Sequence, residues 1–393
     1  MKRILALIFV IVFLASSFSS CQNNKASEGK LKFELNIDGS AYTLVGVEGN
    51  FEETEVEIST YNGLPITAIG DYAFSGCSSI KSVYIANTVT TIGGNAFNNC
   101  TSLENINIPN SVTIIEGCAF FGCSSLKYIT IPQSITKIGE CAFALCDNLM
   151  SIDVDDNNMT YKSIDGNLYT KNQTTLMQYS IGKKDKNFVV PESVLTIEED
   201  AFRGCSSLVN IKISDGVKYI RGKAFTDCKN IVKVVMPNSV EIVEYDAFWG
   251  CDKLEDVSIG DKVNIIGIHA FSPFTRVSID EKNNYYKSVD GNIYSKDGKT
   301  FIQYAIKKDV SEFFLPYGVE IIEYDAFYRC NNLTSVIIPR SVKHISYSSF
   351  IYCDNLKNIK YMGTEEEWNK ILKEEDWFYG AESYTVIYNY TGE

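Results

Sequence analysis

The hydrophobic positions of this chain follow a 23-residue period. Each period opens with an Ala-Phe pair, and with Ala counted as position 1 the apolar positions are 2, 5, 8, 11, 13, 17 and 20. A fixed period of this length is typical of a solenoid, in which stacked units bury a core that no single unit can close. The pairs begin at residues 73, 96, 119, 142, 201, 224, 247, 270 and 326, with Ser349-Phe350 as a diverged copy.

Each unit predicts one short strand with one buried face. Positions 11 and 13 alternate with polar residues, as in Ile106-Asn107-Ile108. Proline at position 14, for example Pro109, ends the strand because it cannot donate to a ladder. The Ala-Phe segment allows about one helical turn at most. We therefore predict an α/β repeat solenoid that is mostly β, right-handed, with stacked parallel strands and about ten coils.

Two segments interrupt the period. The pair after Ala142 comes only at Ala201, and the pair after Ala270 only at Ala326, so each interval holds one ordinary unit and a longer extra segment. The two extra segments resemble each other, and both carry Asp-Gly between alternating stretches, which predicts a β-hairpin. The stretch from Ala73 to Ala201 is also nearly as long as the stretch from Ala201 to Ala326, which indicates that a larger unit was duplicated.

The chain begins with the pattern of an export signal. Lys2 and Arg3 precede an apolar stretch, residues 4–14, and small residues then lead to Cys21. Such a stretch is too short for a stable membrane span. Small residues that end at a cysteine resemble the lipobox of bacterial lipoproteins, in which the cysteine is acylated and becomes the mature N-terminus. The resemblance implies lipidation of Cys21, and ordinary signal cleavage nearby is the alternative.

Both ends of the solenoid have predicted caps. Asp38-Gly39 lies between alternating stretches and predicts an N-terminal hairpin. A capping box that starts at Thr364 predicts a C-terminal helix with Trp368, Ile371 and Leu372 on one face. The predicted organisation is a signal peptide at 1–20, a tether at 21–30, a hairpin cap at 31–55, a first repeat block at 56–153, a hairpin insert at 154–190, a second block at 191–279, a second hairpin insert at 280–315, a third block at 316–360 and a C-terminal cap at 361–393.

The net charge of the chain bears on which partners it can bind. Without residues 1–20 the chain keeps 34 basic and 49 acidic residues, a formal charge of −15. An acidic surface repels phosphate backbones, so no nucleic-acid partner is expected. Beyond the signal, no stretch approaches about 18 consecutive apolar residues, so the lipid at the N-terminus is the expected contact with the membrane.

The cysteines follow the repeat. Nine of the twelve lie four residues after the first residue of their unit, and Phe274 takes that slot in the remaining unit. A slot that accepts Phe is apolar, so we predict these cysteines as buried core residues. Cys118 and Cys141 lie outside the slot but are separated by one period, hence on neighbouring coils. A disulfide between them and two free thiols are the alternatives.

The sequence offers little catalytic chemistry. The two histidines, His269 and His344, are predicted on the coil surface, and a regular solenoid supplies no pocket for a hydrolytic triad. The stretch from Asp153 to Met159 resembles a calcium loop but lacks the required Gly and Glu. We therefore predict no enzyme, no bound metal and no cofactor.

The unit A-F-x-x-C-x-x-L-x-x-I-x-I-P-x-x-V-x-x-I resembles the leucine-rich repeat of the BspA-like bacterial surface proteins. The resemblance covers roughly residues 56–360, and residues 361–368 are similar to the C-terminal end of that family. It implies a surface lipoprotein of host-associated anaerobic bacteria, at the outer membrane or cell surface. Some members are adhesins that bind extracellular-matrix proteins or other bacteria, and the family has no catalytic motif to transfer.

Three surfaces are candidates for binding. The first is the solvent face of the strands, at positions 10 and 12, for which a plain solvated face is the alternative. The second is position 3, where exposed aromatic residues are typical contact anchors but could equally pack on a neighbouring coil. The third is the pair of inserts, which we expect to project from the scaffold as functional loops. The strand-face candidates are Tyr84, Asn107, Tyr128, Lys212, Lys233 and Asp256, and the position-3 candidates are Phe121, Trp249 and Tyr328.

The predicted function is that of a non-catalytic, monomeric cell-surface protein on a lipid anchor. Its expected partner is a host matrix protein, a glycan or the surface of another bacterium. The alternative is a passive structural lipoprotein of the envelope without a specific ligand.

Overall fold

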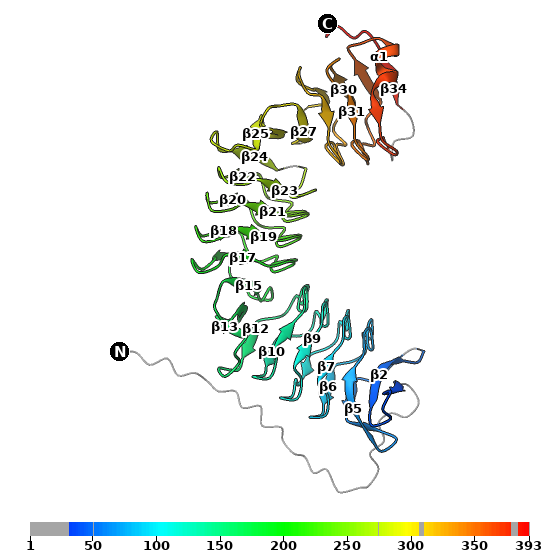
Figure 1. Cartoon of the computed structure of the whole chain (residues 1–393), viewed down its shortest axis with the longest axis vertical. Helices are drawn as coiled ribbons and strands as arrows, with labels where there is room; N and C mark the ends of the chain where they lie inside the picture. The colour runs from blue at the N-terminus through cyan, green and yellow to red at the C-terminus, as the bar shows by residue number, and fades with distance from the viewer. Residues whose placement is uncertain (1–30, 50, 274, 306–309, 379–383, 393) are drawn as a thin grey trace, which may run out of the picture.

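The computed structural model describes residues 31–49, 51–273, 275–305, 310–378 and 384–392. The predicted signal peptide, the tether and Cys21 lie outside these residues. The described chain forms a mostly parallel β-solenoid of about 15 turns with one short helix, α1 (Glu365–Lys370). Three stacks of coils meet at an angle where the two inserts lie (Figure 1). The predicted solenoid is thus confirmed, with more turns than the ten that the Ala-Phe pairs count.

The first block carries two parallel ladders along its coils. One ladder holds the strands predicted at positions 11 and 13, and β10 ends next to Pro132 as expected. The other holds positions 19 and 20, a second strand in addition to the one predicted for each unit. The first ladder is divided in two, because β8 does not pair with β10: one part comprises β3 (Glu55–Ile58), β6 (Ser82–Ile85) and β8 (Asn105–Ile106), and the other comprises β10 (Tyr128–Ile131) and β12 (Ser151–Val154). The second ladder comprises β5 (Leu64–Ile69), β7 (Thr91–Ile92), β9 (Ile114–Ile115) and β11 (Lys137–Ile138).

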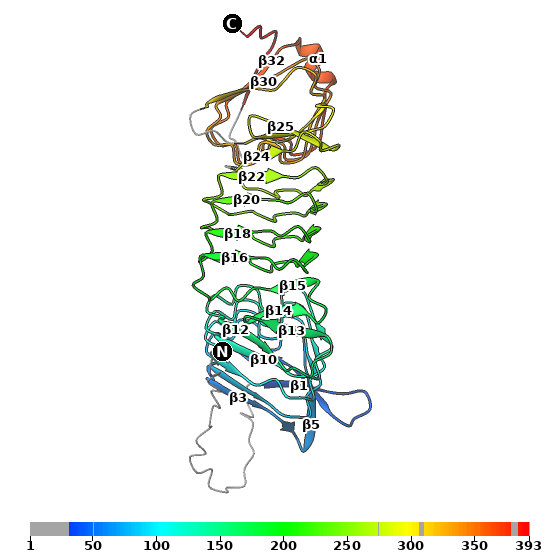
Figure 2. The ribbon, with the colours of Figure 1, turned by 90° about the vertical axis from the view of Figure 1, so that its left-hand side faces the viewer.

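The second block repeats this arrangement, and Figure 2 shows its coils stacked edge to edge. Between its regular coils the pairings join residues at the same position of the unit, as in Ile220 with Val243. The register shifts only beside the inserts, where Val257 pairs with Val277 and Leu176 with Ile197. Its first ladder comprises β16 (Asn187–Val189), β18 (Asn210–Lys212), β20 (Lys233–Val235), β22 (Asp256–Ile259) and β24 (Arg276–Ile279), and its second comprises β15 (Thr175–Gln178), β17 (Thr196–Ile197), β19 (Tyr219–Ile220), β21 (Ile242–Val243) and β23 (Ile265–Ile266).

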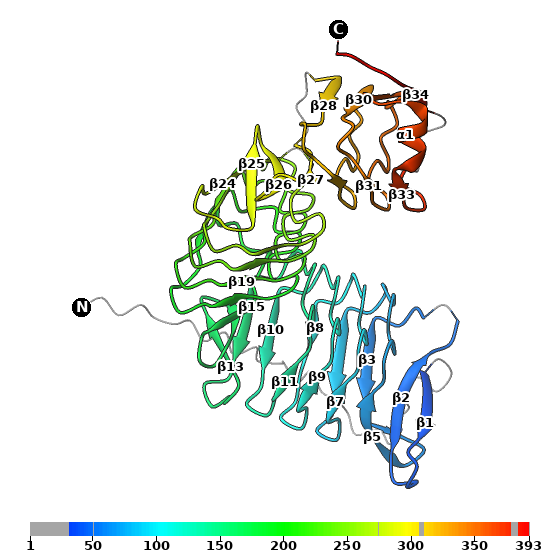
Figure 3. The ribbon, with the colours of Figure 1, turned by 45° about the horizontal axis from the view of Figure 1, so that its top comes forward.

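The third block continues both ladders into the C-terminal cap. Figure 3 shows α1 beside β33 and β34 at the end of this stack. Its first ladder comprises β28 (Glu312–Phe314), β30 (Ser335–Ile338), β32 (Asn358–Tyr361) and β34 (Thr385–Ile387), and its second comprises β27 (Thr300–Gln303), β29 (Ile321–Ile322), β31 (His344–Ile345) and β33 (Leu372–Lys373).

The two caps were predicted with one error. The N-terminal hairpin pairs β1 (Leu31–Leu35) with β2 (Tyr42–Val47), and β2 then joins β5; a short strand, β4 (Thr60–Tyr61), also pairs with β5. The capping box at Thr364 is present, and Trp368 is buried. Leu372 was wrongly placed on the helix: it belongs to β33 and is exposed. The helix ends after six residues because β33 pairs with β31, so the ladder overrides the helical period.

Both inserts contain the predicted hairpins, but they do not project. β13 (Tyr161–Ile164) pairs with β14 (Asn167–Thr170), and β25 (Tyr286–Val289) with β26 (Asn292–Ser295). At the first turn Asp165 and Gly166 have φ of 49° and 73°, the left-handed values of a tight hairpin turn. The expected projection was wrong because β15 and β27 join the coil ladder. Each insert is therefore an additional turn of the solenoid.

The core is divided into three clusters that end at the inserts. The first ends at Leu168, the second runs from Tyr169 to Ile293, and the third begins at Tyr294. Phenylalanine rings at position 2 stack within each block, with centroids 5.2–5.6 Å apart from Phe74 to Phe143. The cysteine slot is buried as predicted, and Cys100 Sγ donates to the Phe74 carbonyl oxygen at 3.1 Å.

Candidate binding site

The ladder of short strands is interrupted at both inserts. It ends at β11 and restarts with the sheet of β15, and it ends again at β23 and restarts with the sheet of β27. We call these interruptions the first and the second junction. A tyrosine hydroxyl takes the place of the missing strand: Ile138 N–H donates to Tyr161 Oη at 2.8 Å, and Ile266 N–H donates to Tyr286 Oη at 3.3 Å.

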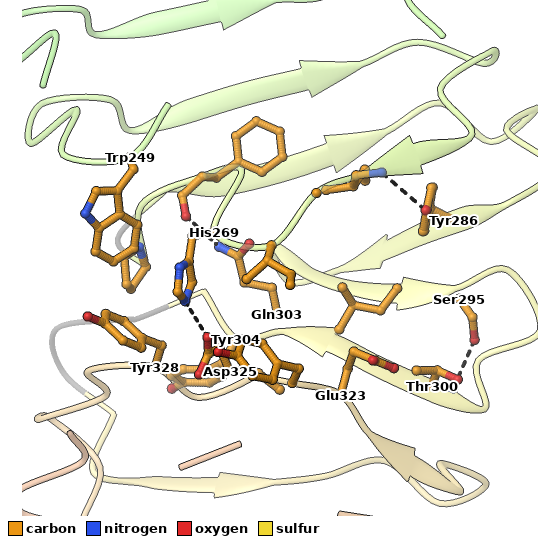
Figure 4. A pocket seen from close by; sticks show the side chains of 18 residues that line it. Trp249, His269, Tyr286, Ser295, Thr300, Gln303, Tyr304, Glu323, Asp325 and Tyr328 are labelled. Atoms are coloured by element: carbon orange, nitrogen blue, oxygen red, sulfur yellow. Dashed lines mark hydrogen bonds and ion pairs between the residues drawn. The ribbon is translucent and has the colours of Figure 1, made fainter. Parts of the chain in front are cut away.

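Each junction encloses a cavity, because the coils on its two sides do not pair there. The first-junction cavity has a volume of about 220 Å³ and the second about 340 Å³. The larger volume lies at the lower end of the range of small-ligand pockets. The second-junction cavity is lined by aromatic, acidic and amide side chains (Figure 4). The side chains that the argument below uses are Trp249, His269, Gln303, Glu323, Asp325 and Tyr328.

His269 lies at the centre of this lining, between two carboxylates. Its Nε2 is 2.7 Å from Asp325 Oδ2, and its Nδ1 is 3.5 Å from Asp246 Oδ1. Burial alone lowers the pKa of His269, but its contacts with Asp246 and Asp325 outweigh burial and raise the pKa to about 9. The imidazole is therefore a cation at neutral pH. Its ion pair with Asp325 joins the second block to the third.

Trp249 and Tyr328 flank the imidazole. The Trp249 and His269 rings have centroids 5.0 Å apart, and the His269 and Tyr328 rings 4.6 Å. Trp249 and Tyr328 also meet edge to face at 5.2 Å. Two of the position-3 candidates, one from the second block and one from the third, are thus brought together across the second junction. Both side chains are half-buried, so each packs on its neighbours and still faces the cavity.

Phe121, the third position-3 candidate, lies at the first junction. The guanidinium of Arg203 is 5.5 Å from its ring centroid, and Arg203 also pairs with Asp200 at 3.3 Å. Phe121 therefore meets the next block as Trp249 does, but through a cation. It does not line the first-junction cavity.

The strand-face candidates lie away from both cavities. Tyr84 and Tyr128 are 57% and 63% exposed and are free to make contacts, and Lys212 and Lys233 are also exposed. Asn107 has a structural role, because its side chain accepts from Ile85 N–H at 2.8 Å and donates to Ile85 O at 2.9 Å. These bonds continue the ladder where β8 ends.

Asp256, the remaining strand-face candidate, forms an exposed ion pair with Arg276 at 2.9 Å. The six strand-face residues are spread over several strands of two blocks, and none lines the second-junction cavity. The sequence therefore identified two residues of the cavity, Trp249 and Tyr328, and four exposed positions that do not converge on it.

Sequence reasoning missed His269 and its two carboxylates. His269 was expected on the open coil surface, but only 23% of its side chain is exposed. His344 lies nearer the surface, with Nε2 2.8 Å from Glu374. One signal was available: Asp246, His269 and Asp325 each precede an Ala-Phe pair. The backbone is left-handed at all three, with φ of 53–54°, so the three residues have the same conformation at the same position of their units.

Cys118 and Cys141 are both free thiols, the second of the two alternatives. Cys141 belongs to the one group of potential metal ligands found in the described part of the chain, with Glu199 and Asp200. Burial, followed by Asp200, raises the pKa of the Cys141 thiol far above its ordinary value. Glu199 already accepts a hydrogen bond from Tyr245 Oη at 2.6 Å. These groups satisfy one another, and we assign no metal to them.

The stretch that resembles a calcium loop is a structural turn. Asp155 Oδ1 accepts from Asn157 N–H at 2.9 Å, and Asn158 is completely buried. The Asn158 amide donates to the carbonyl oxygens of Pro132 and Ile135, and its Oδ1 accepts from the N–H groups of the two residues that start the hairpin. The polar residues therefore serve the backbone of the insert.

Stacked 23-residue coils, a phenylalanine stack and a buried cysteine slot define a leucine-rich-repeat solenoid of the bacterial type. A family model described as BspA type leucine rich repeat region, in six copies, matches residues 67–185, 179–296 and 301–383. The chain belongs to this family. It has no significant match among the curated proteins.

Solved structures show the same fold at low sequence identity. A leucine-rich repeat protein from Eubacterium ventriosum is 22% identical, with a TM-score of 0.50 over 90% of this chain and 93% of that one. The pneumococcal vaccine antigen PcpA is 18% identical, with a TM-score of 0.53 over 89% of this chain and 79% of that one. At these identities the likeness concerns the fold alone. In the described residues, no helix is long and apolar enough to cross a membrane.

Proposed function

We propose that this chain is a non-catalytic surface protein that binds its partner at the second-junction cavity. The observation that carries the proposal is the convergence of Trp249, His269 and Tyr328 on a cavity of about 340 Å³. Half-buried Trp and Tyr side chains beside fixed charges are the usual anchors of a protein or glycan contact. The coils on both sides are held by ladders, so the cavity is formed before a partner arrives.

The same geometry argues against acid–base catalysis at this place. A general base must be able to take up a proton near neutral pH. Both ring nitrogens of His269 face carboxylates, and its pKa of about 9 keeps the ring protonated. The imidazole therefore acts as a fixed cation that orders Asp246 and Asp325.

We further propose that Cys21 carries a lipid that holds the chain at the outer membrane or cell surface. The partner would then be a host matrix protein, a glycan or a neighbouring bacterium. Labelling of growing cells with a radioactive fatty acid should mark the wild-type chain but not the Cys21→Ser variant. Equal labelling of both would contradict the anchor.

The binding proposal is tested with soluble protein that starts after Cys21. Immobilised matrix proteins and a glycan array should reveal saturable binding, and Trp249→Ala should weaken it at least tenfold. Trp249→Phe, which keeps an aromatic ring, should retain more affinity than Trp249→Ala. Tyr84→Ala and Phe121→Ala are the matched controls, on the strand face and at the first junction.

Two results would contradict the proposal. If Tyr84→Ala weakens binding and Trp249→Ala does not, the strand face is the binding surface. If no ligand class binds in a saturable way, the chain is the passive structural lipoprotein of the alternative. The thermal unfolding of each variant shows whether it still folds.

A further inference from the structure

A third set of hydrogen bonds joins neighbouring coils through the Ala-Phe segments. The N–H groups of the residue before Ala and of the Phe donate to alternate carbonyl oxygens of the next coil. Asp200 N–H donates to Gly222 O at 3.2 Å, and Phe202 N–H donates to Ala224 O at 2.8 Å. The same two bonds recur two coils later, where Asp246 N–H and Phe248 N–H are the donors. In every such pair the N–H points along the solenoid toward the next coil.

This set of bonds stops at both junctions, and the second has the larger cavity. In the described part of the chain, neither His269 N–H nor Phe271 N–H has a hydrogen-bond acceptor. Phe271 is 1% exposed, and a buried N–H without an acceptor is costly. Both residues line the cavity, and by the direction of the preceding coils their N–H groups point into it. The cavity therefore presents two donors at residues i and i+2, the spacing of an unpaired strand edge.

The charge of the cavity selects among occupants. Among the described residues, His269 is the one cation of the lining, whereas Asp325 and the exposed Glu323 are carboxylates of the lining and Asp246 contacts His269 from beside it. No ion pair of Glu323 occurs within the described ranges. The net charge is negative, so an anionic ligand is disfavoured and a cationic side chain is favoured.

We infer that the second-junction cavity binds an extended basic peptide segment, whose alternate carbonyl oxygens accept from His269 N–H and Phe271 N–H. The segment takes the place that the Ala-Phe segment of the following coil has within a block, so its backbone completes the interrupted bonds in the manner of strand addition. A Lys or Arg side chain of the segment meets Glu323. The inference rests on the proposed function and specifies its ligand as a peptide.

The chain itself supplies the probe. The segment from Ile220 to Thr226, Ile-Arg-Gly-Lys-Ala-Phe-Thr, accepts the equivalent bonds from Asp200 and Phe202 through Gly222 O and Ala224 O. It also carries two cations, Arg221 and Lys223. A labelled synthetic peptide of this sequence should bind the soluble protein in a saturable way. A peptide with Glu at both basic positions should bind at least tenfold more weakly.

Protein variants separate the cavity from general charge attraction. Glu323→Gln should weaken the binding of the basic peptide about fivefold. Glu198→Gln removes the equivalent carboxylate at the smaller first-junction cavity and should leave the affinity unchanged. An equal loss in both variants would overturn the inference, because it would assign binding to the acidity of the whole surface.

Hydrogen exchange tests the backbone contact directly. Peptide binding should slow amide exchange in residues 268–272 and leave residues 140–144, the equivalent segment of the first junction, unchanged. Binding without protection at 268–272, or no binding of the basic peptide, would overturn the inference. If the peptide does not bind, but a glycan or matrix protein binds in a Trp249-dependent manner, the proposed function stands and only a peptide ligand is excluded. If the peptide protects 268–272, a protein partner is supported over a glycan.

Discussion

The two junctions have the same backbone and different linings. Residues of the two junctions correspond where they take the same position of the repeat unit or of the insert. The residues that hold the backbone are the same: a buried Asn at 158 and 283, and a Tyr at 161 and 286 whose hydroxyl takes the bond of the missing strand. The side chains around the gap differ at four positions. Cys118, Phe121, Cys141 and Arg203 at the first junction correspond to Asp246, Trp249, His269 and Tyr328 at the second.

The comparison shows that one set of residues folds the junction and a different set determines the surface it exposes. At the first, Arg203 pairs with Asp200 and covers Phe121, and the cavity is about 220 Å³. At the second, the cation is an imidazole, the guanidinium is replaced by a phenol, and the cavity grows to about 340 Å³. The contact across the gap also differs: at the first junction the guanidinium of Arg203 lies against the ring of Phe121, and at the second His269 forms an ion pair with Asp325.

The largest expected effect is on the shared framework. Asn158→Ala should lower the free energy of unfolding by about 3 kcal/mol, because it leaves two buried carbonyls and two N–H groups without partners. Asn283→Ala should cost a similar amount, since Asn283 makes the same four bonds. Urea unfolding measures both, with exposed Asn157→Ala as the control. A large cost at one junction only would show that the two frameworks are not equivalent.

The next largest effect is a pH dependence of the free energy of unfolding, which is expected at the second junction only. The folded pKa of His269 is about 9, above its ordinary value of 6.5, so protonation favours the folded state. The contribution is complete below pH 6.5 and is lost as pH rises through about 9. A rise in pKa from 6.5 to about 9 corresponds to about 3 kcal/mol. The partial exposure of the side chain reduces the expected loss to about 2 kcal/mol. Burial also raises the pKa of the core thiols, which lowers stability as pH approaches 9 in any variant. Urea unfolding at pH 6, 7.5 and 9 should therefore show a larger loss for the wild type than for His269→Gln, and the difference is the contribution of His269. A loss of equal size in His269→Gln would assign the pH dependence to other groups.

A smaller effect is expected at Arg203. Arg203→Met keeps the contact with Phe121 but removes the charge, which leaves the buried carboxylate of Asp200 without its cation. Because Arg203 is partly exposed, we expect a loss of about 1.5 kcal/mol rather than the larger cost of a fully buried pair. Tyr328→Phe, at the equivalent position, should change stability by less than about 0.5 kcal/mol, as is usual for a change that removes no buried partner. If the two variants cost the same, the charge at the first junction has no special role.

The smallest effect concerns the thiols that line up at the first junction. In the folded protein a maleimide should react with Cys118 and Cys141, because both thiols are partly exposed. The reaction should be slow, because burial raises the pKa of both thiols. The nine core cysteines should react only after denaturation. Cys118→Ser with Cys141→Ser should leave the unfolding free energy within about 0.5 kcal/mol, the usual range for substitutions away from the core. Rapid labelling of a core cysteine would show that the coils open in the native state.

The local features of the fold could be read from the sequence. The strand at positions 11 and 13, the proline stop, the Asp-Gly hairpins and the buried cysteine slot each depend on a few neighbouring residues. The junction could not be read in this way. Whether Trp249 meets Tyr328 depends on how the whole second insert closes its turn. It also depends on the absence of pairing between β23 and β27, which no local pattern encodes. The prediction for Leu372 was wrong for the same reason, because pairing with a distant strand, β31, determines its conformation.

The three separate cores have a mechanical consequence. A chain held at its N-terminus and pulled at its C-terminus carries the load through the stacks in series, and each stack closes its own core. One stack can therefore open with its own core once the strand pairs and hydrogen bonds of the adjoining insert are broken. A block of about 125 residues releases roughly 400 Å of chain when it opens. Under shear the protein should therefore lengthen in three separate steps, and a partner bound across the second junction would join the last two steps into one.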